Sequence, residues 1–483
     1  MQWLQRLFGY RRAPHPPLYL HDTLRGEKVL FEPYEGKPVR MYNCGPTVYG
    51  RQHIGNLSMF VFTDVLRRTL EYNGFTVDQV INITDVGHLT SDEDEGEDKM
   101  TKGLQREGLP LSLENMRALG EKYTTLFLED LQTLNIDTNR IRFPRASDHI
   151  PAQIAMIQAL EEKGYAYVGT RGVYFDTTRF PEYGKLGGID LAGLKAGARV
   201  KETGDKRNPI DFLLWKFDKT LGWPSPWGKG FPGWHIECSA MARSLLGSRI
   251  DIHTGGIEHI PVHHNNEIAQ TEAATGKRPF SRFWLHRAHV SLEGVKIAKS
   301  EGNVLYLLDI VDRGYDPLAL RYLFLQAHYR KPSNFSWEAL GAAQQSLTRL
   351  RAAYAASVPP EDAKGSALPY ERDFHLHVNN DLDTPGALAV VWGLVRDKAV
   401  APSAKRSALQ RFDSVLGLSL EEVAPAATIT TDELPERVRT MLEEREAARK
   451  KKDWLRADML RDKILNAGYT LEDTPSGPRL SKK

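Results

Sequence analysis

The sequence predicts an α/β protein that has a parallel sheet in its first part and is mainly helical in its last part. Residues 39–42 read as a short strand broken by Gly45 and Pro46, residues 57–72 carry apolar side chains at helical spacing, and residues 75–83 read as a second strand. Strand, glycine turn, helix and strand in this order are typical of a βαβ unit, whose strands are parallel. The chain has 483 residues, a length that predicts roughly three domains.

Further elements follow in a mixed and then helical order. We expect strands at residues 173–176, 212–216 and 284–290, and helices at residues 113–134, 149–163, 318–326, 337–356, 374–378, 386–400, 407–416 and 437–467. The glycine- and proline-rich tract 222–233 is expected to be a loop, and segments 357–366 and 422–431 have the composition of linkers. The acidic run 91–98 is expected to be a solvated loop.

The composition describes a soluble globular protein. Apolar residues make up 41% of the chain and charged residues 26%, and the formal net charge is +2, so any surface for nucleic acid must be local. Two cysteines cannot form a disulfide framework, which favours a reducing compartment. The N-terminus lacks the apolar run of a signal peptide, and no stretch approaches the roughly twenty apolar residues of a membrane helix. We therefore expect a cytoplasmic protein with no membrane partner.

Metal-binding side chains are concentrated in residues 231–270. One of the two cysteines is followed there by histidines and a glutamate, namely Cys238, His253, His259, His263, His264 and Glu267. Zinc takes sulfur, nitrogen and oxygen ligands, and the i, i+4 spacing of His263 and Glu267 places both on one face of a helix. The alternative is a histidine-rich surface loop beside a buried cysteine that only packs. The spacing alone leaves both interpretations open, because it matches no known zinc-finger pattern.

A second motif, His53-Ile54-Gly55-Asn56, lies at the turn between the first strand and its helix. Gly55 has no side chain, so a planar group such as a nucleobase can lie against the backbone. His53 would lie near the helix N-terminus, which favours phosphate. Ligands bind at the carboxyl ends of parallel strands, which puts Cys44 and His53 at a candidate site. The alternative is a helix that merely starts at a glycine turn.

A third motif is the loop Lys296-Ile297-Ala298-Lys299-Ser300, followed by Gly302 and Asn303. Two lysines and a serine on a glycine-bordered loop can neutralise a polyphosphate whose charge changes during a reaction. Taken alone, the segment fits a solvated basic loop better.

The order and separation of these motifs resemble the class I aminoacyl-tRNA synthetases, and most closely the cysteinyl-tRNA synthetase family. The resemblance runs from about residue 41 to the C-terminus and includes segments 43–49, 211–216, 224–228, 232–241, 267–270 and 456–475. It implies a catalytic domain with a Rossmann-like, doubly wound parallel sheet, followed by an α-helical bundle and a small anticodon-binding domain. The implied boundaries are an N-terminal extension at 1–38, the catalytic domain at 39–335 with a connective insertion at about 110–220 and a lysine-loop junction at about 290–335, a tRNA-binding bundle at 336–421, and the C-terminal domain at 432–483.

The resemblance also implies the activity. ATP with Mg²⁺ would activate L-cysteine to cysteinyl-adenylate, and the cysteinyl group would pass to the 3′ end of tRNA(Cys). One zinc ion per chain would recognise the substrate thiol, and the enzyme would act as a monomer. By matching motifs, the zinc ligands are Cys44, Cys238, His263 and Glu267; the ATP contacts are His53, Gly55, Asn56, Lys296, Lys299 and Ser300; the cysteine contacts are Thr47, Trp234 and His253. Of these, His53, Asn56, Lys296 and Lys299 would be catalytic.

The sequence departs from the family pattern at both signatures. Asn56 stands where the family usually has His, and Ile297 and Ala298 replace the usual Met and Ser. Two other functions therefore stay open: a ligase that joins activated cysteine to a small amine, and a catalytically inactive relative. Near the C-terminus, the basic residues 449–452 suit phosphates, while Trp454 and Tyr469 could either stack on bases or belong to a core.

Overall fold

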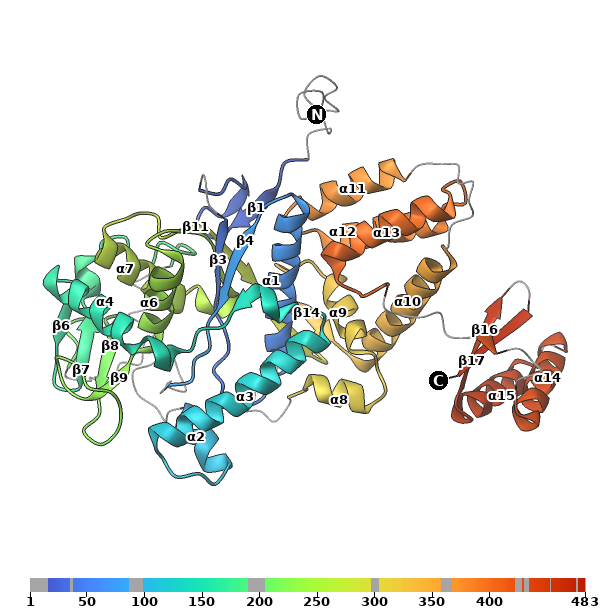
Figure 1. Ribbon diagram of the computed structural model, residues 1–483, viewed down its shortest axis with the longest axis horizontal. Coiled ribbons are helices and arrows are strands. Elements are labelled where there is room, and N and C mark those ends of the chain that lie inside the picture. The colour runs from blue at the N-terminus through green and yellow to red at the C-terminus, as the bar shows by residue number, and fades with distance from the viewer. Residues whose placement is uncertain are drawn as a thin grey trace, which may run out of the picture.

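The computed structural model describes residues 16–34, 38–86, 99–189, 205–296, 304–357, 367–421, 428–429, 434–451, 453–474 and 477–482. The predicted acidic loop at 91–98, the proposed lysine-loop residues Lys299 and Ser300, and most of the two predicted linkers lie outside these residues. Figure 1 shows the chain arranged as a central sheet with helices on both sides, a lobe at one end, and a helical region and a small domain at the other.

A five-stranded parallel sheet forms the centre of the molecule, which confirms the predicted fold class. Its strand order is β11-β10-β3-β4-β5, and every neighbouring pair is parallel. The strands are β3 (Val39–Asn43), β4 (Val77–Ile81), β5 (Ile141–Arg142), β10 (Ile250–Gly256) and β11 (Ser281–Arg287). Strand β10 is buried along its whole length, as expected of a strand in the middle of a parallel sheet covered on both faces.

Helices cover the two faces of this sheet. Figure 1 shows α1 on one side of β3 and β4, and α6 and α7 on the other. These helices are α1 (Ile54–Tyr72), α6 (Trp234–Leu246) and α7 (His263–Thr275). Met156, Ile157 and Leu160 of α4 (Ile150–Glu162) pack with α6 and α7 in one apolar cluster. Helices α2 (Lys99–Arg106) and α3 (Leu113–Thr133) pack on the α1 side through a second cluster.

A four-stranded antiparallel sheet forms the lobe beyond α4. Its order is β6-β7-β8-β9, made of β6 (Ala166–Val168), β7 (Gly172–Phe175), β8 (Phe212–Phe217) and β9 (Gly230–Pro232). The predicted loop 222–233 therefore ends in a strand, which pairs with β8 and leads directly into α6. Short 3-10 turns, Thr138–Arg140, Ala146–His149, Thr177–Arg179 and Ile257–His259, connect several of these elements.

The described part of the N-terminal segment, residues 16–34, contains two strands. They form an antiparallel hairpin of β1 (Tyr19–Asp22) and β2 (Glu27–Leu30). The Thr23 N–H donates to the Trp284 carbonyl of β11 at 2.8 Å, and the Trp284 N–H donates to the buried Asp22 carboxylate at 2.9 Å. The hairpin is thus attached to the edge of the parallel sheet.

Beyond β11 the chain leads into the helical region. The predicted strand 284–290 is two separate strands, because β11 ends at Arg287 and β12 (Val290–Leu292) belongs to a small sheet ordered β13-β12-β14. The other two strands are β13 (Val295–Lys296) and β14 (Ser333–Phe335). The helices are α8 (Leu307–Asp312), α9 (Pro317–Leu325), α10 (Trp337–Ala356), α11 (Leu368–Val378), α12 (Thr384–Arg396) and α13 (Pro402–Leu416), and the last five share one apolar core.

A buried charged cluster, here called the junction cluster, joins the helical region to α1. Its members are Asp64, Arg67 and Arg68 of α1 and Arg321 of α9. Arg321 donates to the Asp64 carboxylate at 2.6 Å, to the Leu416 carbonyl of α13 at 2.7 Å and to the Leu134 carbonyl after α3 at 2.9 Å. One side chain therefore bonds to three helices of different parts of the chain.

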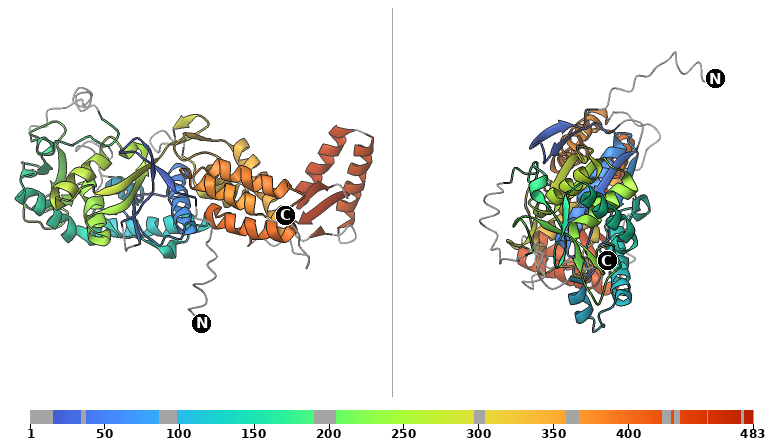
Figure 2. Two further views of the ribbon diagram at one scale, coloured as in Figure 1. Left: turned by 90° about the horizontal axis from the view of Figure 1, so that it is seen from above. Right: turned by 90° about the vertical axis from the view of Figure 1, so that its left-hand side faces the viewer.

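The last described residues form a small domain with its own core. Helices α14 (Glu436–Lys450) and α15 (Trp454–Asn466) pack on a sheet ordered β15-β17-β16, with β15 (Thr428–Ile429), β16 (Tyr469–Thr474) and β17 (Gly477–Lys482). Figure 2 shows this domain beyond the helical bundle, at the end of the molecule far from the antiparallel lobe. Among the described residues, no helix has the length and apolar character needed to cross a bilayer.

Candidate active site and metal centre

A cavity of about 400 Å³ opens at the carboxyl ends of the parallel strands. The connection from β3 to α1, the end of β4, the first turn of α6 and the residues after β11 line it. This is the position at which ligands bind in open α/β sheets. Cys44, Cys238 and His263 share the wall of the cavity with His53, Gly55 and Asn56 at the start of α1.

Cys44 is fixed in place by the sheet. It follows β3 directly, and its N–H donates to the Thr254 carbonyl of the neighbouring strand β10 at 3.1 Å. The next residue must be glycine, because a Cβ added to Gly45 would lie 1.6 Å from the Asn82 carbonyl oxygen. The chain therefore passes close to the end of β4 at Gly45, and Cys44 lies in the wall of the cavity.

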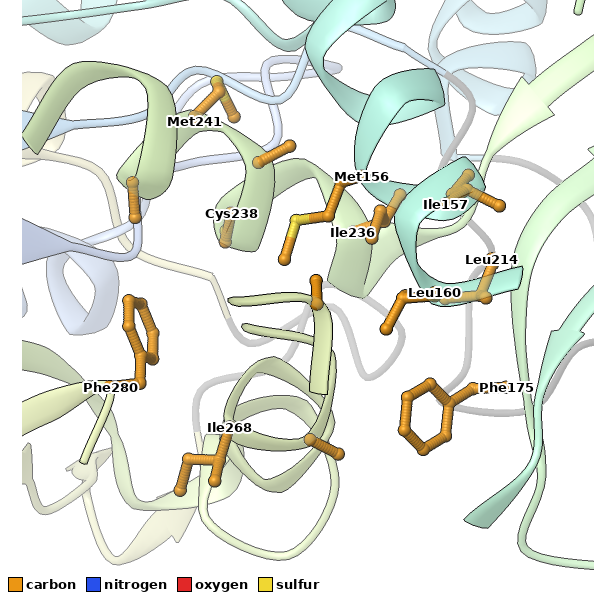
Figure 3. Packing of buried hydrophobic residues seen from close by; sticks show 14 of the residues in the cluster. Met156, Ile157, Leu160, Phe175, Leu214, Ile236, Cys238, Met241, Ile268 and Phe280 are labelled. Carbon is orange, nitrogen blue, oxygen red and sulfur yellow. The ribbon is translucent and has the colours of Figure 1, made fainter. Parts of the chain in front are cut away.

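Cys238 lies on α6 among apolar side chains. Figure 3 shows it beside Ile236 and Met241 of its own helix, with Ile268 of α7 and Phe280 in the same cluster. This packing holds α6 against α7, so that Cys238 meets His263 and Glu267, which are one helical turn apart on α7. The predicted i, i+4 arrangement on a helix is present.

The four side chains Cys44, Cys238, His263 and Glu267 form a buried group, here called the metal cluster. Their ligand atoms all lie within 4.8 Å of one another, and each residue is at most 6% exposed. His263 Nε2 is 3.0 Å from Glu267 Oε1, and Cys44 Sγ is 3.8 Å from the same oxygen. Two sulfurs, one imidazole and one carboxylate suit a borderline-soft cation such as zinc.

The electrostatics of the metal cluster favour charged ligands. A hydrogen bond from Cys44 and the neighbouring His263 lower the pKa of Cys238 to about 6. Burial raises the pKa of Cys44 well above its usual value. Burial opposes charge on His263, but Glu267 and Cys238 raise the pKa of His263 to about 10. Burial also opposes charge on Glu267, but His253 and His263 lower the pKa of Glu267 to about 2. A thiolate, an imidazolium and a carboxylate are thus held together, a set in which a cation can replace the proton.

A second layer of polar side chains supports the metal cluster. His253 Nε2 lies 3.0 Å from Glu267 Oε2, and His235 Nδ1 lies 2.9 Å from His263 Nδ1. A chain of hydrogen bonds runs from the Thr23 hydroxyl to His286 Nδ1 at 2.7 Å and from His286 Nε2 to His264 Nδ1 at 2.7 Å. It ends at Cys44, whose sulfur is 3.2 Å from His264 Nε2. The β1–β2 hairpin therefore contributes to the support of a metal ligand.

A second set of donors overlaps the first. Cys44, His253, His264 and Glu267 also have ligand atoms within 4.8 Å of one another. His253 and His264 are fully buried and are not among the residues that line the cavity, whereas Cys238 and His263 line it. A cation held by the first set would face the cavity, and one held by the second set would lie behind the wall.

The other end of the cavity is the start of α1. His53 is the N-cap residue, and its Nδ1 accepts the Asn56 N–H at 3.2 Å, so the ring proton resides on Nε2. The Ile54 N–H donates to the Leu305 carbonyl at 2.9 Å, and His53 forms a β-bridge with Tyr306. Lys296 ends β13, which pairs with β12 beside the cavity. Both flanks of the loop 297–303 therefore lie next to the cavity, although Lys299 and Ser300 are outside the described residues.

Of the residues predicted to contact cysteine, two line the cavity. Thr47 is bridged to Thr84 at the end of β4, and the Trp234 ring stacks on His263 with centroids 4.5 Å apart. His253 instead lies behind Glu267 and stacks on Trp284 at 4.5 Å.

The C-terminal candidates differ from one another. Trp454 begins α15 and is 58% exposed, whereas Tyr469 packs against the apolar core of the small domain. Lys450 and Lys451 are exposed at the end of α14, and Lys452 is outside the described residues.

Sequence reasoning missed His286 and Arg287, which end β11 and contact the site. The available signal was their place at the carboxyl end of a predicted parallel strand. It was obscured because the sequence predicted one continuous strand to residue 290.

Comparison with known families gives matches to two family models. Residues 30–345 match the family described as "tRNA synthetases class I (C) catalytic domain", and residues 431–477 match "Cysteinyl-tRNA ligase anticodon binding domain". The first match includes the parallel sheet, the cavity and the metal cluster, and the second covers most of the small C-terminal domain.

Curated relatives match along nearly the whole chain. A protein named cysteine–tRNA ligase 1 from Burkholderia lata is 48% identical over 470 residues, covering 96% of this chain and 97% of the relative. A cysteine–tRNA ligase from Thermus thermophilus is 42% identical over 483 residues, covering 96% of this chain and 98% of the relative. Among solved structures, methionyl-tRNA synthetase from Mycobacterium tuberculosis in complex with methionyl-adenylate matches with a TM-score of 0.56 and 16% identity, covering 79% of this chain and 90% of that chain. This last likeness concerns the fold.

Proposed function

The chain belongs to the cysteinyl-tRNA synthetase family of class I aminoacyl-tRNA synthetases, and on this premise we propose how its residues carry out the cysteine–tRNA ligase reaction. The observation that carries the proposal is the metal cluster at the wall of the cavity. Its ligands come from three separate segments and include the only two cysteines of the chain. The position of the cluster therefore supports the proposal that the substrate is recognised in this cavity.

We propose that Cys44, Cys238, His263 and Glu267 hold one zinc ion. This set is preferred over Cys44, His253, His264 and Glu267 because three of its members, including Cys238 and His263, line the cavity, where a substrate can reach the ion. A bound zinc ion would offer a coordination position to the thiolate of cysteine, and soft sulfur binds zinc better than a serine hydroxyl does. His253 would act on the site through Glu267, whose carboxylate it orients by a hydrogen bond of 3.0 Å.

The remainder of the cysteine substrate would lie between Thr47 and Trp234. Both line the cavity next to the metal cluster, and the Trp234 ring is held by its stack on His263. An aromatic wall and a small hydroxyl leave room for a short side chain and give the site one polar contact.

ATP would bind at the other end of the cavity. The His53 Nε2–H and the N-terminus of α1 would meet the phosphates, Gly55 would leave space for adenine, and the Asn56 amide would bond the ribose or a phosphate. Lys296, Lys299 and Ser300 would reach the β- and γ-phosphates and stabilise charge on the leaving pyrophosphate, with Mg²⁺ bound to the nucleotide. The carboxylate of cysteine would then attack the α-phosphate and release pyrophosphate. A hydroxyl of the 3′-terminal adenosine of tRNA(Cys) would take the cysteinyl group from the adenylate and release AMP.

The helical bundle and the small domain would bind the body of tRNA(Cys). The exposed Trp454 is suited to stack on an unpaired base, and Lys450 and Lys451 to contact phosphates. Tyr469 is better assigned to the core of that domain, because it packs there. We expect one polypeptide to be sufficient for the reaction and the enzyme to act in the cytoplasm.

Exchange of labelled pyrophosphate into ATP tests the activation step. We expect exchange that requires cysteine and is not supported by serine, and subsequent charging of tRNA(Cys). Absence of cysteine-dependent exchange would refute the proposal. Exchange with charging of a small amine in place of tRNA would favour the alternative acceptor.

A further inference from the structure

Arg287 is a buried arginine at the edge of the cavity and has no acidic partner among the described residues. It is 5% exposed, ends β11 and lines the same cavity as Asn56. Its Nε donates to the Ser58 hydroxyl at 2.8 Å, and its guanidinium lies 5.6 Å from the centre of the Phe324 ring. No described carboxylate lies within ion-pair distance of it. Burial lowers the pKa of Arg287 to about 10, because no neighbouring anion offsets the loss of water.

Arg321, which is fully buried, shows what a purely structural arginine looks like in this chain. Its guanidinium donates through Nε and both terminal nitrogens, to two carbonyls and to the Asp64 carboxylate. Arginine offers five N–H donors in a fixed fork, and a buried charge that leaves them unused costs free energy. Arg287 uses one donor on a neutral hydroxyl, so its charge is uncompensated in a way that the charge of Arg321 is not.

Ser58 directs this charge towards the start of α1. Its hydroxyl donates to the Gly55 carbonyl at 2.7 Å, which leaves an oxygen lone pair to accept from Arg287. Arg287 is thereby connected through one side chain to Gly55, and it lines the same cavity as Asn56, whose amide carries no charge. Among the described residues that line the cavity, the only other lysine or arginine is Lys99, which lies 5.8 Å from the Trp234 ring centre at the opposite end.

We propose that Arg287 binds a phosphate group in this cavity and that Ser58 is its positioning residue. The inference rests on the proposed function for the identity of the phosphate, which belongs either to ATP or to the 3′-terminal nucleotide of tRNA. A guanidinium binds phosphate oxygens through two parallel N–H bonds, so a bound phosphate would supply the missing partner. The motif His53-Ile54-Gly55-Asn56 ends in an uncharged residue, and Arg287 at the end of β11 would add a fixed positive charge to the same cavity.

The test compares Arg287→Met, which removes the charge, with Arg287→Lys, which keeps it without the fork. Binding of ATP to the full-length protein is measured by calorimetry, and pyrophosphate exchange gives the KM for ATP and for cysteine separately. If the phosphate is that of ATP, the Kd and KM for ATP rise about 10- to 100-fold in the Met variant, since a hydrogen bond to a charged group contributes roughly 1.5–3 kcal/mol. The Lys variant is expected to recover part of the loss, while the KM for cysteine stays unchanged.

A second arm separates the two sources of phosphate. Transfer of cysteine from preformed cysteinyl-adenylate to tRNA(Cys) is measured in a single turnover. Normal ATP binding with slow transfer assigns the phosphate to tRNA, and weak ATP binding with normal transfer assigns it to ATP. Ser58→Ala should shift the same constant by a smaller factor, because the charge remains but its orientation is lost.

The thermal midpoint of each variant distinguishes a structural role. Unchanged ATP binding and unchanged transfer in both Arg287 variants, with or without a lower midpoint, would overturn the proposal. The outcome is separable from the proposed function as a whole, because ATP binding by calorimetry needs neither cysteine nor tRNA.

Discussion

The junction cluster and the metal cluster are both buried and both charged, yet they are built in opposite ways. In the junction cluster, Asp64 receives hydrogen bonds from Arg67, Arg68 and Arg321 at 2.5–2.7 Å, and Arg321 uses its remaining donors on main-chain carbonyls. Every strong donor of Arg321 therefore has a protein partner. No cavity residue takes part, since none of the four lines the cavity at the strand ends.

The metal cluster instead brings together four possible metal ligands, whose polar partners are one another and neighbouring histidines. Two thiols, an imidazole and a carboxylate share the same few ångströms, and three of the four residues line the cavity. The contrast teaches that burial of charge alone does not mark a functional site in this chain. The feature that distinguishes the candidate site is that its buried polar group also faces a cavity.

Asp64→Asn should have the largest effect on stability. The substitution leaves Arg321 buried without its counter-charge, and breaking a buried ion pair in this way costs about 3–5 kcal/mol. Urea unfolding should show this decrease while zinc content per folded protein stays at one. A loss of zinc without a loss of stability would contradict the division between the two clusters.

Cys238→Ser should have the converse effect. Zinc affinity is expected to fall by more than about 100-fold, since even residues that only support a ligand contribute 10- to 100-fold. Zinc content after dialysis and the KM for cysteine should change together. Ser244→Ala on the same helix is the matched control. Among the described residues, the Ser244 hydroxyl bonds to the Met241 carbonyl. Full zinc content in Cys238→Ser would remove Cys238 from the ligand set.

His286→Gln tests whether the second layer belongs to the metal cluster. It interrupts the chain from Thr23 to His264 and Cys44, so zinc affinity should fall about 10-fold, at the lower end of effects of supporting residues. Competition with a chelator measures this change. His149→Gln is the control, because His149 bonds to the Arg145 carbonyl and takes no part in this series of hydrogen bonds. It should leave the zinc affinity unchanged. Equal zinc affinities of the two variants would show that His286 does not support the metal cluster.

The smallest effect is expected from pH at the junction cluster. Burial opposes ionisation of Asp64, but Arg321, Arg68 and Arg67 lower its pKa below the usual 3.8. A carboxylate whose pKa is lower in the folded state than in the unfolded state stabilises the folded protein at any pH above its unfolded-state pKa. This contribution is lost as the pH falls through its folded-state pKa. The difference in free energy of unfolding between wild type and Asp64→Asn should therefore be constant from pH 5 to 8 and shrink below about pH 4. A difference that grows in acid would reverse this assignment.

The sequence predicted the βαβ unit around α1 and the bounds 337–356 of α10 because each depends on local periodicity. It also predicted that Cys44, Cys238, His263 and Glu267 would meet, and the structure brings them together. That prediction came from the family resemblance, since spacing alone left the metal and the surface-loop interpretations open. The roles of the ATP and cysteine contacts remain predictions.

The remaining features depend on partners far away in the chain. Strand β10 was missed because Asp251, His253 and Thr254 interrupt its apolar pattern. Each of them forms a hydrogen bond to another segment, such as the Arg40 N–H that donates to Asp251 at 2.8 Å. The hairpin was missed because its strands are short and polar and its docking site is on β11. No window of neighbouring residues contains this information.

The hairpin also limits when strand β1 can complete its hydrogen bonds during synthesis of the protein. The His21 N–H donates to Asp381, 360 residues later in the chain, and the Tyr19 N–H donates to the Asn379 carbonyl. At a synthesis rate of about 5–20 residues per second, roughly 20–70 seconds pass before these acceptors exist. The edge of strand β1 that faces residues 379–381 therefore stays unpaired until this distant part of the chain has been synthesised.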